Sequence, residues 1–409
     1  MGKPGRARYL FLLFPAVATL VSTASCRQGI VPASAVMHPT EENLPPPGGP
    51  LIRADTVISG LSSPERAAAW AAARRALLDA TPVTSVGTPD GSGPDLLGTV
   101  GDVAGDGEGN VYIHDNTTQE VLLFNAEGDF LQRMGGKGEG PEEFRSLRGF
   151  VRLPDGRLVA GQYGGPAKVL VPGGNGYEFA GRLLRDQVTE TLAVNDMCAL
   201  ADRIFVHSNS LAGGELVIHE LSADSGSVVA SLAEPYRSDF AWDRQRRSNG
   251  RIACGMEPAT LVWGFYYFPI VKAYRPDNTL LWTALIEDFT QGLIYQNNAT
   301  SRTVHPIGPP TEYIVAAHAL KPGFVVLQTW LHEIRTNPEN GERVRESLRR
   351  RTYLLDQETG NGGLVSDSLP RIAWIGDSTY AATWSFPYPR VEVRLMPRRE
   401  SGQVAQEPQ

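Results

Sequence analysis

Three histidines are the residues of this chain best suited to bind a transition metal, and two of them recur in matching contexts. His114 ends the run Val111-Tyr112-Ile113-His114, and His207 ends the similar run Ile204-Phe205-Val206-His207. His318 lies in a later apolar segment. Because neutral imidazole is a common zinc ligand, His114, His207 and His318 form a candidate metal site. The alternative is that each histidine is a surface or packing residue.

Two cysteines, Cys198 and Cys254, are candidates for a disulfide. The chain has 3 cysteines, and the third, Cys26, lies at the end of an N-terminal apolar run. In an oxidising compartment a lone pair of cysteines is readily bridged. The alternative is two buried free thiols in different parts of the fold.

Two aromatic clusters could bind a sugar or a peptide by stacking. The candidate residues are Trp263, Phe265, Tyr266 and Tyr267 in the first cluster, and Trp384, Phe386 and Tyr388 in the second. The alternative is that these large side chains pack inside the fold.

The usual sequence motifs of hydrolases and nucleotide-binding proteins do not occur in this chain. The sequence contains neither Gly-x-Ser-x-Gly nor His-Glu-x-x-His. The glycine-rich run 135–140 lacks the Gly-Lys-Ser/Thr of a phosphate-binding loop and does not open a helix, so it reads as a turn. Asp106-Gly107-Glu108-Gly109 lacks the register of a calcium loop and predicts a hairpin turn. No catalytic residue is predicted.

The N-terminus is organised as an export signal. Basic residues precede an apolar run from Leu10 to Val21, which is shorter than the roughly 20 residues that span a bilayer. Thr23-Ala24-Ser25-Cys26 resembles a lipobox, although Thr23 replaces the usual Leu, Val or Ile. We therefore expect a bacterial envelope lipoprotein, anchored to the membrane by Cys26 alone. The alternative is cleavage after Ala35, which would give a secreted or periplasmic soluble protein.

Composition describes an acidic globular protein. The chain of 409 residues is 42% hydrophobic and 20% charged, with a net charge of −7. Loss of residues 1–25 removes three basic residues and leaves a charge of about −10, which disfavours nucleic acid as a partner. The 43 glycines and 30 prolines predict many chain reversals.

The elements that hold these residues repeat along the chain. In the clearest unit, strands alternate with turns at 106–110 and 126–128, and the run 135–144 closes the unit. Later units turn at 154–156, 173–176, 201–202, 223–226, 276–278, 358–361 and 376–377. Four strands in about 40 residues, without helices between them, predict an all-β fold, a six-bladed β-propeller of four-stranded antiparallel blades. The sixth unit lacks a fourth strand, which we expect residues 82–86 to supply.

The same pattern predicts the organisation of the whole chain. Residues 1–25 are the signal peptide, 26–60 a tether and linker, 61–81 a short helix that packs on the body, 82–397 the propeller, and 398–409 a disordered tail. Ser63 suits the helix N-cap and Pro64 its first position. The expected packing face of the helix is Ala67, Trp70, Ala71, Leu77 and Leu78.

Three segments together resemble the NHL-like six-bladed β-propellers of bacterial lipoproteins. They are 106–115, 121–128 and the run Gly-Lys-Gly-Glu-Gly-Pro-Glu-Glu-Phe at 136–144, in which Glu142 replaces the usual Gly. The resemblance is specific over about residues 82–185. It implies the propeller fold, and that branch is largely without an assigned activity.

Loop length predicts which face of the propeller binds. In a four-stranded meander the first–second and third–fourth turns share one face, and the predicted tight turns belong to this set. The long connections 135–147, 233–250 and 286–312, both aromatic clusters and a projecting hairpin around 330–351 belong to the other face. Arginines of the hairpin, with Arg244, Arg246 and Arg247, would make this face less acidic.

Two functions follow as hypotheses. The first is a non-catalytic binding or scaffold module that engages a protein, peptide or glycan with the long-loop face. The second is a metal-dependent lyase or lactonase, with zinc or calcium, acting in the central channel.

Overall fold

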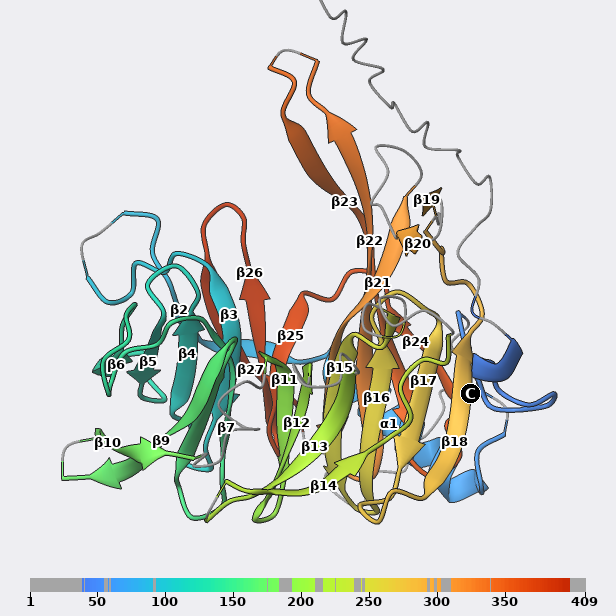
Figure 1. The fold of residues 1–409 in the computed structure, drawn as a ribbon, viewed down its shortest axis with the longest axis horizontal. Helices are drawn as coiled ribbons and strands as arrows, with labels where there is room; N and C mark the ends of the chain where they lie inside the picture. The colour runs from blue at the N-terminus through green and yellow to red at the C-terminus, as the bar shows by residue number, and fades with distance from the viewer. Residues whose placement is uncertain are drawn as a thin grey trace, which may run out of the picture.

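The computed structural model shows a ring of antiparallel sheets with one helix beside it (Figure 1). It describes residues 39–397 except 40, 55–57, 59, 91–92, 175, 184–192, 210–215, 225, 239–243, 245–246, 293–294, 298–299, 303–309 and 339. The predicted signal peptide, Cys26 and the tail from residue 398 therefore lie outside the described residues.

Six four-stranded blades follow one another along the chain, as the repeat predicted. Blade 1 contains β3 (Val100–Gly105), β4 (Val111–Asp115), β5 (Glu120–Phe124) and β6 (Phe130–Gly135). Blade 2 contains β7 (Leu147–Arg152), β8 (Leu158–Gln162), β9 (Gly165–Gly173) and β10 (Gly176–Arg182). Blade 3 contains β11 (Ala193–Leu200), β12 (Arg203–Asn209), β13 (Leu216–Ser222) and β14 (Val228–Leu232).

The second half of the ring has longer connections. Blade 4 contains β15 (Gly250–Met256), β16 (Ala259–Phe265), β17 (Ile270–Tyr274) and β18 (Leu280–Ile286). A small hairpin, β19 (Tyr295–Asn297) and β20 (Thr300–Arg302), precedes blade 5. Blade 5 contains β21 (Thr311–Leu320), β22 (Phe324–Thr336), β23 (Arg343–Asp356) and β24 (Gly362–Ser366). Blade 6 contains β25 (Arg371–Ile375), β26 (Thr379–Trp384), β27 (Arg390–Leu395) and β2 (Thr81–Val86).

Burial along each blade explains why the blades stack. In blade 1 every residue of β4 is buried, whereas the outermost strand β6 is mostly exposed. A central strand buried on both faces needs a neighbouring sheet on each side, because one blade alone leaves its faces in water. The first strands of successive blades lie next to one another, and β25 of blade 6 returns to β3 of blade 1.

Strand β2 closes the ring, which confirms the predicted strand exchange. It pairs antiparallel with β27, from Thr81 opposite Leu395 to Val86 opposite Val391. The N-terminal strand thus completes the blade formed by the C-terminal ones. Pairing removes the open edge that β27 would otherwise present.

The predicted tether is wrong for residues 41–53, which are part of the folded body. Strand β1 (Leu51–Arg53) inserts in parallel between β18 and β24, and its Ile52 is fully buried. The short helix η1 (Glu41–Asn43) lies nearby in sequence, and the Asn43 side chain exchanges hydrogen bonds with the backbone of Arg237. Proline-rich composition predicted a spacer here, but the three residues after Pro50 bridge the outer edges of blades 4 and 5.

Helix α1 (Pro64–Leu78) forms as predicted, with Ser63 as its N-cap, and its expected packing face is correct for Trp70 and Leu77 but not for Ala67, Ala71 and Leu78. Trp70, Ala73 and Leu77 are buried against blades 5 and 6, whereas Ala67, Ala71 and Leu78 are exposed. The Trp70 indole donates a hydrogen bond to the Leu354 carbonyl (2.9 Å). In an alanine-rich helix several faces look equally apolar, so only the large side chains identify the buried one.

Connections of different length emerge on the two faces of the ring. All first–second and third–fourth turns contain five residues or fewer, and we call their side the tight-turn face. The opposite, long-loop face carries the connections from β2 to β3, β6 to β7, β14 to β15 and β18 to β21. Hairpin β22–β23 rises far above the ring on this face (Figure 1). Five connections on this face, β4–β5, β8–β9, β16–β17, β24–β25 and β26–β27, also contain five residues or fewer, so the predicted asymmetry holds for only part of its loops and not for the two that carry the aromatic clusters.

Candidate functional site

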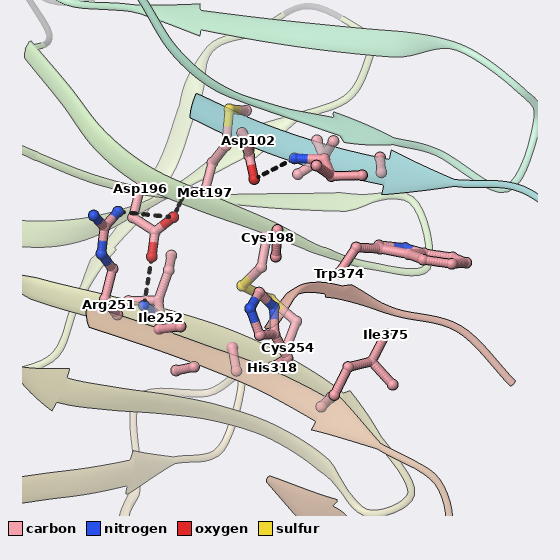
Figure 2. A pocket seen from close by; sticks show the side chains of 18 of the residues that line it. Asp102, Asp196, Met197, Cys198, Arg251, Ile252, Cys254, His318, Trp374 and Ile375 are labelled. Carbon is pink, nitrogen blue, oxygen red and sulfur yellow. Dashed lines mark hydrogen bonds and ion pairs between the residues drawn. A yellow bond between two sulfur atoms is a disulfide. The ribbon is translucent and has the colours of Figure 1, made fainter. Parts of the chain in front are cut away.

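The six first strands enclose a central channel with a cavity of about 250 Å³. Asp102, Asp196, Arg251, His318 and Arg371 line it, each from a different blade. Figure 2 shows Asp196 and Arg251 at one end, Trp374 and Ile375 at the other, and His318 beside the cysteines between them. Acidic, basic and imidazole side chains therefore converge in a space large enough for a small molecule.

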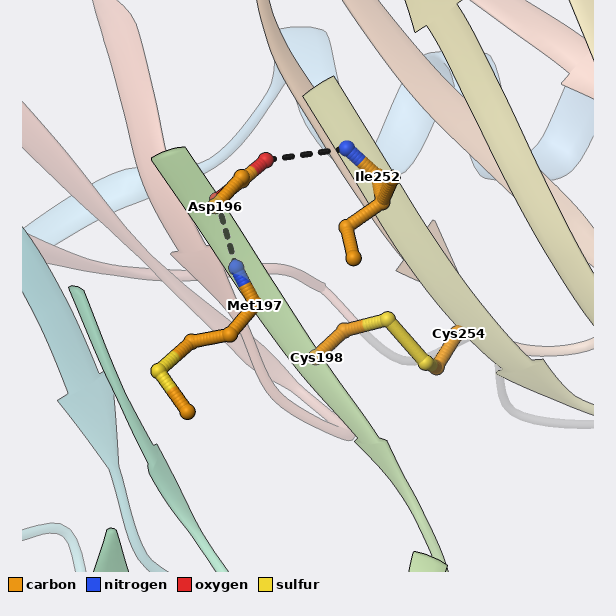
Figure 3. Close-up of a disulfide and its surroundings, with 5 residues drawn as sticks. All are labelled: Asp196, Met197, Cys198, Ile252 and Cys254. Carbon is orange, nitrogen blue, oxygen red and sulfur yellow. Dashed lines mark hydrogen bonds between the residues drawn. A yellow bond between two sulfur atoms is a disulfide. The ribbon is translucent and has the colours of Figure 1, made fainter. Parts of the chain in front are cut away.

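The two aspartates hold neighbouring blades together. The Asp102 carboxylate accepts hydrogen bonds from the N–H groups of Val103 (2.9 Å) and of Phe150 in blade 2 (3.2 Å). The Asp196 carboxylate does the same for Met197 (3.1 Å) and for Ile252 in blade 4 (2.9 Å) (Figure 3). Each carboxylate thus satisfies a backbone donor of the next blade, which is a structural role.

Between blades 5 and 6 a neutral side chain on the second strand, Gln328 of β22, has the same role. The Gln328 side-chain oxygen accepts from the Ile372 N–H (2.7 Å), and its amide donates to the Pro370 carbonyl (2.9 Å). Ile372 therefore corresponds to Ile252, and the residues that precede them, Arg371 and Arg251, occupy equivalent positions in blades 6 and 4.

Both arginines have donors that the described residues leave open. Arg371 donates one hydrogen bond, to the Gly101 carbonyl (3.3 Å), and forms no ion pair within the described part of the chain. Arg251 lies 3.9 Å from Asp196 and donates to the Asn195 carbonyl at 3.5 Å. Since a guanidinium carries five N–H donors, most of these donors remain available to the channel.

Burial changes the acid–base properties of the channel residues. Loss of solvation, then the negative charge of Asp196, raises the pKa of Asp102 to about 6. Burial also raises the pKa of Asp196. Burial, then the positive charge of Arg251, lowers the pKa of Arg371. The pKa of His318 falls to about 4 by burial, so its imidazole is neutral at pH 7.

Cys198 and Cys254 form a disulfide between β11 and β15, the first strands of blades 3 and 4 (Figure 3). Their Cα atoms lie 5.6 Å apart, a normal distance for a bridged pair. The disulfide lines the cavity and joins the same two blades as the contact between Asp196 and Ile252.

The three histidines of the predicted metal site are not brought together. Among the described residues no group of three His, Cys, Asp or Glu side chains is placed to hold a metal ion. His114 and His207 occupy equivalent second strands, as predicted, whereas His318 lies on a first strand facing the channel. The His207 imidazole contacts the Ser248 carbonyl (3.0 Å) and that of His318 the Ile372 carbonyl (2.9 Å), so both contribute to contacts between blades.

The first aromatic cluster belongs to the core. Trp263 and Phe265 lie within β16, not after it, and both are buried. Their rings stack with centroids 4.5 Å apart. Tyr267 is also buried, and only Tyr266 is partly exposed. Packing thus accounts for most of this candidate ligand platform.

The second aromatic cluster lies on the long-loop face, at the β26–β27 connection. The Arg390 guanidinium covers the rings of Trp384 (4.8 Å) and Tyr388 (5.5 Å). Phe386 is 83% exposed, the highest value among the large hydrophobic residues described. Only Phe386 therefore offers a ring that is largely open to a partner.

A series of rings joins blade 4 to the base of hairpin β22–β23. Tyr266 contacts Tyr313 (4.9 Å between ring centroids), Tyr313 contacts His332 (5.9 Å), and His332 contacts Trp330 (4.7 Å). The Arg350 guanidinium lies over Trp330 at 4.5 Å. These contacts fix the direction in which the hairpin leaves the ring.

The arginines expected on the long-loop face divide into different environments. Arg247 is buried and stacks on the rings of Tyr236 and Phe268, which corrects its expected surface position. Arg244 is half-buried and donates to the Ser238 carbonyl (2.7 Å), and Arg246 lies outside the described residues. A lone cation in a loop is easily mistaken for a surface group when aromatic rings can enclose it.

The glycine-rich run is the predicted turn between blades 1 and 2. Its carbonyls at Gly140, Pro141 and Glu143 all accept hydrogen bonds from the Lys168 ammonium of blade 2. Phe144 is buried against Gly135, where an added side chain would collide with the ring. The run thus connects the two blades. The other predicted turn, between β3 and β4, is capped by Asp106, whose carboxylate accepts hydrogen bonds from the N–H groups of Glu108 and Asn110.

The sequence-based reasoning missed Asp102, Asp196, Arg251 and Arg371. A signal for the arginines was present: Arg251-Ile252-Ala253 and Arg371-Ile372-Ala373 repeat the same three residues at the start of a first strand. A comparison of the units at these positions would have identified the pair.

Comparison with known proteins supports the fold. Residues 96–152 match the family DUF5128, described as a 6-bladed beta-propeller. A solved member of the DUF4221 family from Bacteroides vulgatus is 8% identical, with a TM-score of 0.53 over 77% of this chain and 97% of its own. A putative exported protein from Bacteroides fragilis is 10% identical, with a TM-score of 0.49 over 85% of this chain and 99% of its own. No curated protein sequence matches. The chain is thus a β-propeller, and its residues 96–152 are similar to a family of six-bladed propellers.

Proposed function

We propose that this protein is an exported, lipid-anchored binding module that engages a protein partner with its long-loop face. The observation that carries the proposal is the exposure of apolar side chains on that face. Phe386 is 83% exposed, and Val344 and Leu348 on the projecting hairpin are 48% and 41% exposed. Exposed apolar groups held on rigid supports are typical of contact surfaces.

The support beneath these residues favours a protein over a glycan. Arg350 and His332 contact the ring of Trp330, and Arg390 covers those of Trp384 and Tyr388. Sugar binding by stacking needs an open aromatic face, whereas isolated apolar side chains on a hairpin and a loop suit a protein surface.

Anchoring is proposed from the sequence. Cys26 follows an apolar run that ends in a lipobox-like segment. In the described residues no helix is long and apolar enough to cross a membrane. A Cys26→Ala variant should move from the membrane fraction to the soluble envelope fraction, and mass spectrometry of the wild type should find a diacylglyceryl group on Cys26. Wild-type protein without lipid would contradict the anchor.

Site-specific photo-crosslinking in intact cells of the source organism tests the binding face. A benzophenone side chain placed at Phe386 or at Val344 should give a covalent adduct with one protein partner. The matched control is Met256, which is 53% exposed at the start of a tight turn on the opposite face. Adducts formed equally at Met256, or at none of the three positions, would contradict the proposal.

A channel enzyme is the second candidate, because Asp102, Asp196 and His318 line one cavity and the pKa of Asp102 is raised to about 6. The described residues place no three metal ligands together, so this candidate is tested through the channel residues themselves. Under this hypothesis Asp102→Asn or His318→Ala should abolish turnover of a channel substrate and leave partner capture at Phe386 intact.

A further inference from the structure

We propose that the central channel is a binding site for a small organic carboxylate, held between Arg251 and Arg371 with its hydrocarbon part directed toward Trp374. This site is separate from the proposed partner surface on the long-loop face. The proposal rests on the cavity, on the open donors of the two arginines and on the change from polar to apolar lining along the channel.

The arginines provide the polar end of the site. They occupy equivalent positions in blades 4 and 6, and both line the cavity. A guanidinium presents its donors in a planar fork that matches a carboxylate with two parallel hydrogen bonds. The described partners of Arg371 amount to one carbonyl at 3.3 Å, so its fork is largely unused.

Anion binding also resolves an electrostatic problem in the channel. The positive charge of Arg251 contributes to lowering the pKa of Arg371, so the two cations repel each other through the cavity. A carboxylate placed between them would be attracted to both. Asp102 and Asp196 offset part of this repulsion, since each acts to raise the pKa of Arg371, but its pKa stays lowered.

At the other end of the channel Arg152 is the one charged side chain among the described lining residues, and the rest of that end is apolar. Trp374 lies three residues after Arg371 on β25, which corresponds to about 10 Å along a strand. The Trp374 ring lies against Gly105 and Gly376 at the tight-turn end. Ala253, Ala317 and the Cys198–Cys254 disulfide line the space between. Such a lining suits an aliphatic or aromatic chain of about six carbon atoms attached to the carboxylate.

The aspartates predict how binding depends on pH. Asp102 faces Asp196 from blade 3, Arg371 from blade 6 and the Phe150 N–H from blade 2. Below its pKa of about 6, Asp102 is neutral and no longer repels an anion. Affinity for an anion that stays ionised should therefore rise between pH 7.5 and pH 5.5. A zwitterion bound through its ammonium group would show the opposite trend.

Titration calorimetry on the purified mature protein tests the site. Hexanoate should bind, while acetate and hexan-1-ol, which lack the chain or the charge, should bind at least tenfold more weakly. Arg371→Gln should weaken hexanoate binding about 10- to 100-fold, the range expected for charged hydrogen bonds. Arg152→Gln removes an arginine at the tight-turn end of the same channel, beside Tyr177, and should change the affinity less than about threefold. Hexanesulfonate, ionised throughout, should bind more tightly at pH 5.5 than at pH 7.5.

A second measurement needs no variant and keeps the test independent of folding defects. Crystals of the wild-type protein soaked with 6-bromohexanoate should show anomalous scattering from bromine near Trp374 and the carboxylate between Arg251 and Arg371. Bromine elsewhere, equal binding of hexan-1-ol, or binding of zwitterions alone would overturn the proposal. Photo-crosslinking at Phe386 would be unaffected by any of these outcomes.

Discussion

Removal of the Cys198–Cys254 disulfide should destabilise the propeller by about 4 kcal/mol. The bridge closes a loop of 56 residues between the first strands of blades 3 and 4. Without the disulfide, the conformational entropy of the unfolded chain is higher, which favours unfolding. The chain-entropy relation gives about 14 cal/mol/K for this loop, which is about 4 kcal/mol at 25 °C.

The corresponding shift in melting temperature is moderate because the domain is large. About 300 ordered residues give an unfolding entropy of roughly 600 cal/mol/K, so a loss of about 4 kcal/mol lowers Tm by about 7 °C. Circular dichroism of the Cys198→Ala/Cys254→Ala variant and of the wild type, without reductant, measures this difference. Addition of dithiothreitol should lower the Tm of the wild type toward that of the variant and leave the variant unchanged.

Equal melting temperatures of the two proteins without reductant would contradict this prediction. They would mean that the contacts between β11 and β15, including that of Asp196 with Ile252, restrict the chain as fully without the bridge. An equal shift of the double variant by reductant would also contradict it, because the reductant would then act at a site other than the bridge.

Three further predictions concern other contacts between blades. Lys168→Met leaves three carbonyls without their donor, so the free energy of unfolding measured in urea should fall by about 3 kcal/mol. Amide hydrogen exchange in residues 136–146 should become faster. Unchanged exchange would contradict the structural role of the ammonium group. The pKa of Asp102 is raised from 3.8 to about 6 in the native state, so the native state binds more protons than the unfolded state, and stability should fall as pH rises from about 4 to about 6. Asp102→Asn should remove this pH dependence, and at pH 7 its free energy of unfolding should exceed that of the wild type by at most about 3 kcal/mol. Parallel curves of unfolding free energy against pH for the two proteins would refute this prediction. Val86→Asp places a charge at a buried position of β2 and should open the ring at β27, giving dimers or aggregates in size-exclusion chromatography, whereas a stable monomer would show that closure is dispensable.

Turn chemistry made the blades predictable from the sequence. Asp106 and its following glycines specify a tight turn, and the structure shows why: the carboxylate accepts from two backbone N–H groups of that turn. Strand exchange was predictable for a related reason, since a blade of three strands leaves an edge that residues 82–86 could pair. Local rules of this kind depend only on neighbouring residues and are therefore visible in one sequence.

Features that depend on distant contacts were not predictable in the same way. Strand β1 has three residues, too few to show an alternating pattern, and its partners in β18 and β24 lie more than 200 residues away. Five aromatic residues nearly in succession predict a loop that includes Trp263 and Phe265, because they mask the end of strand β16. Their burial depends on blades 3 and 5, which enclose them from both sides.

The channel arginines show what a single sequence still contains after its strands are assigned. The repeated Arg-Ile-Ala places isoleucine where the preceding blade captures its N–H, through Asp196 in one case and Gln328 in the other. Because side chains alternate along a strand, a residue adjacent to that isoleucine points in a different direction, toward the channel axis. Packing between blades requires the isoleucine, whereas the neighbouring arginine adds only one long hydrogen bond to the adjacent blade, from Arg371 to Gly101 and from Arg251 to Asn195. A half-buried cation that occurs twice at one structural position and leaves most of its donors open is best explained by what it binds.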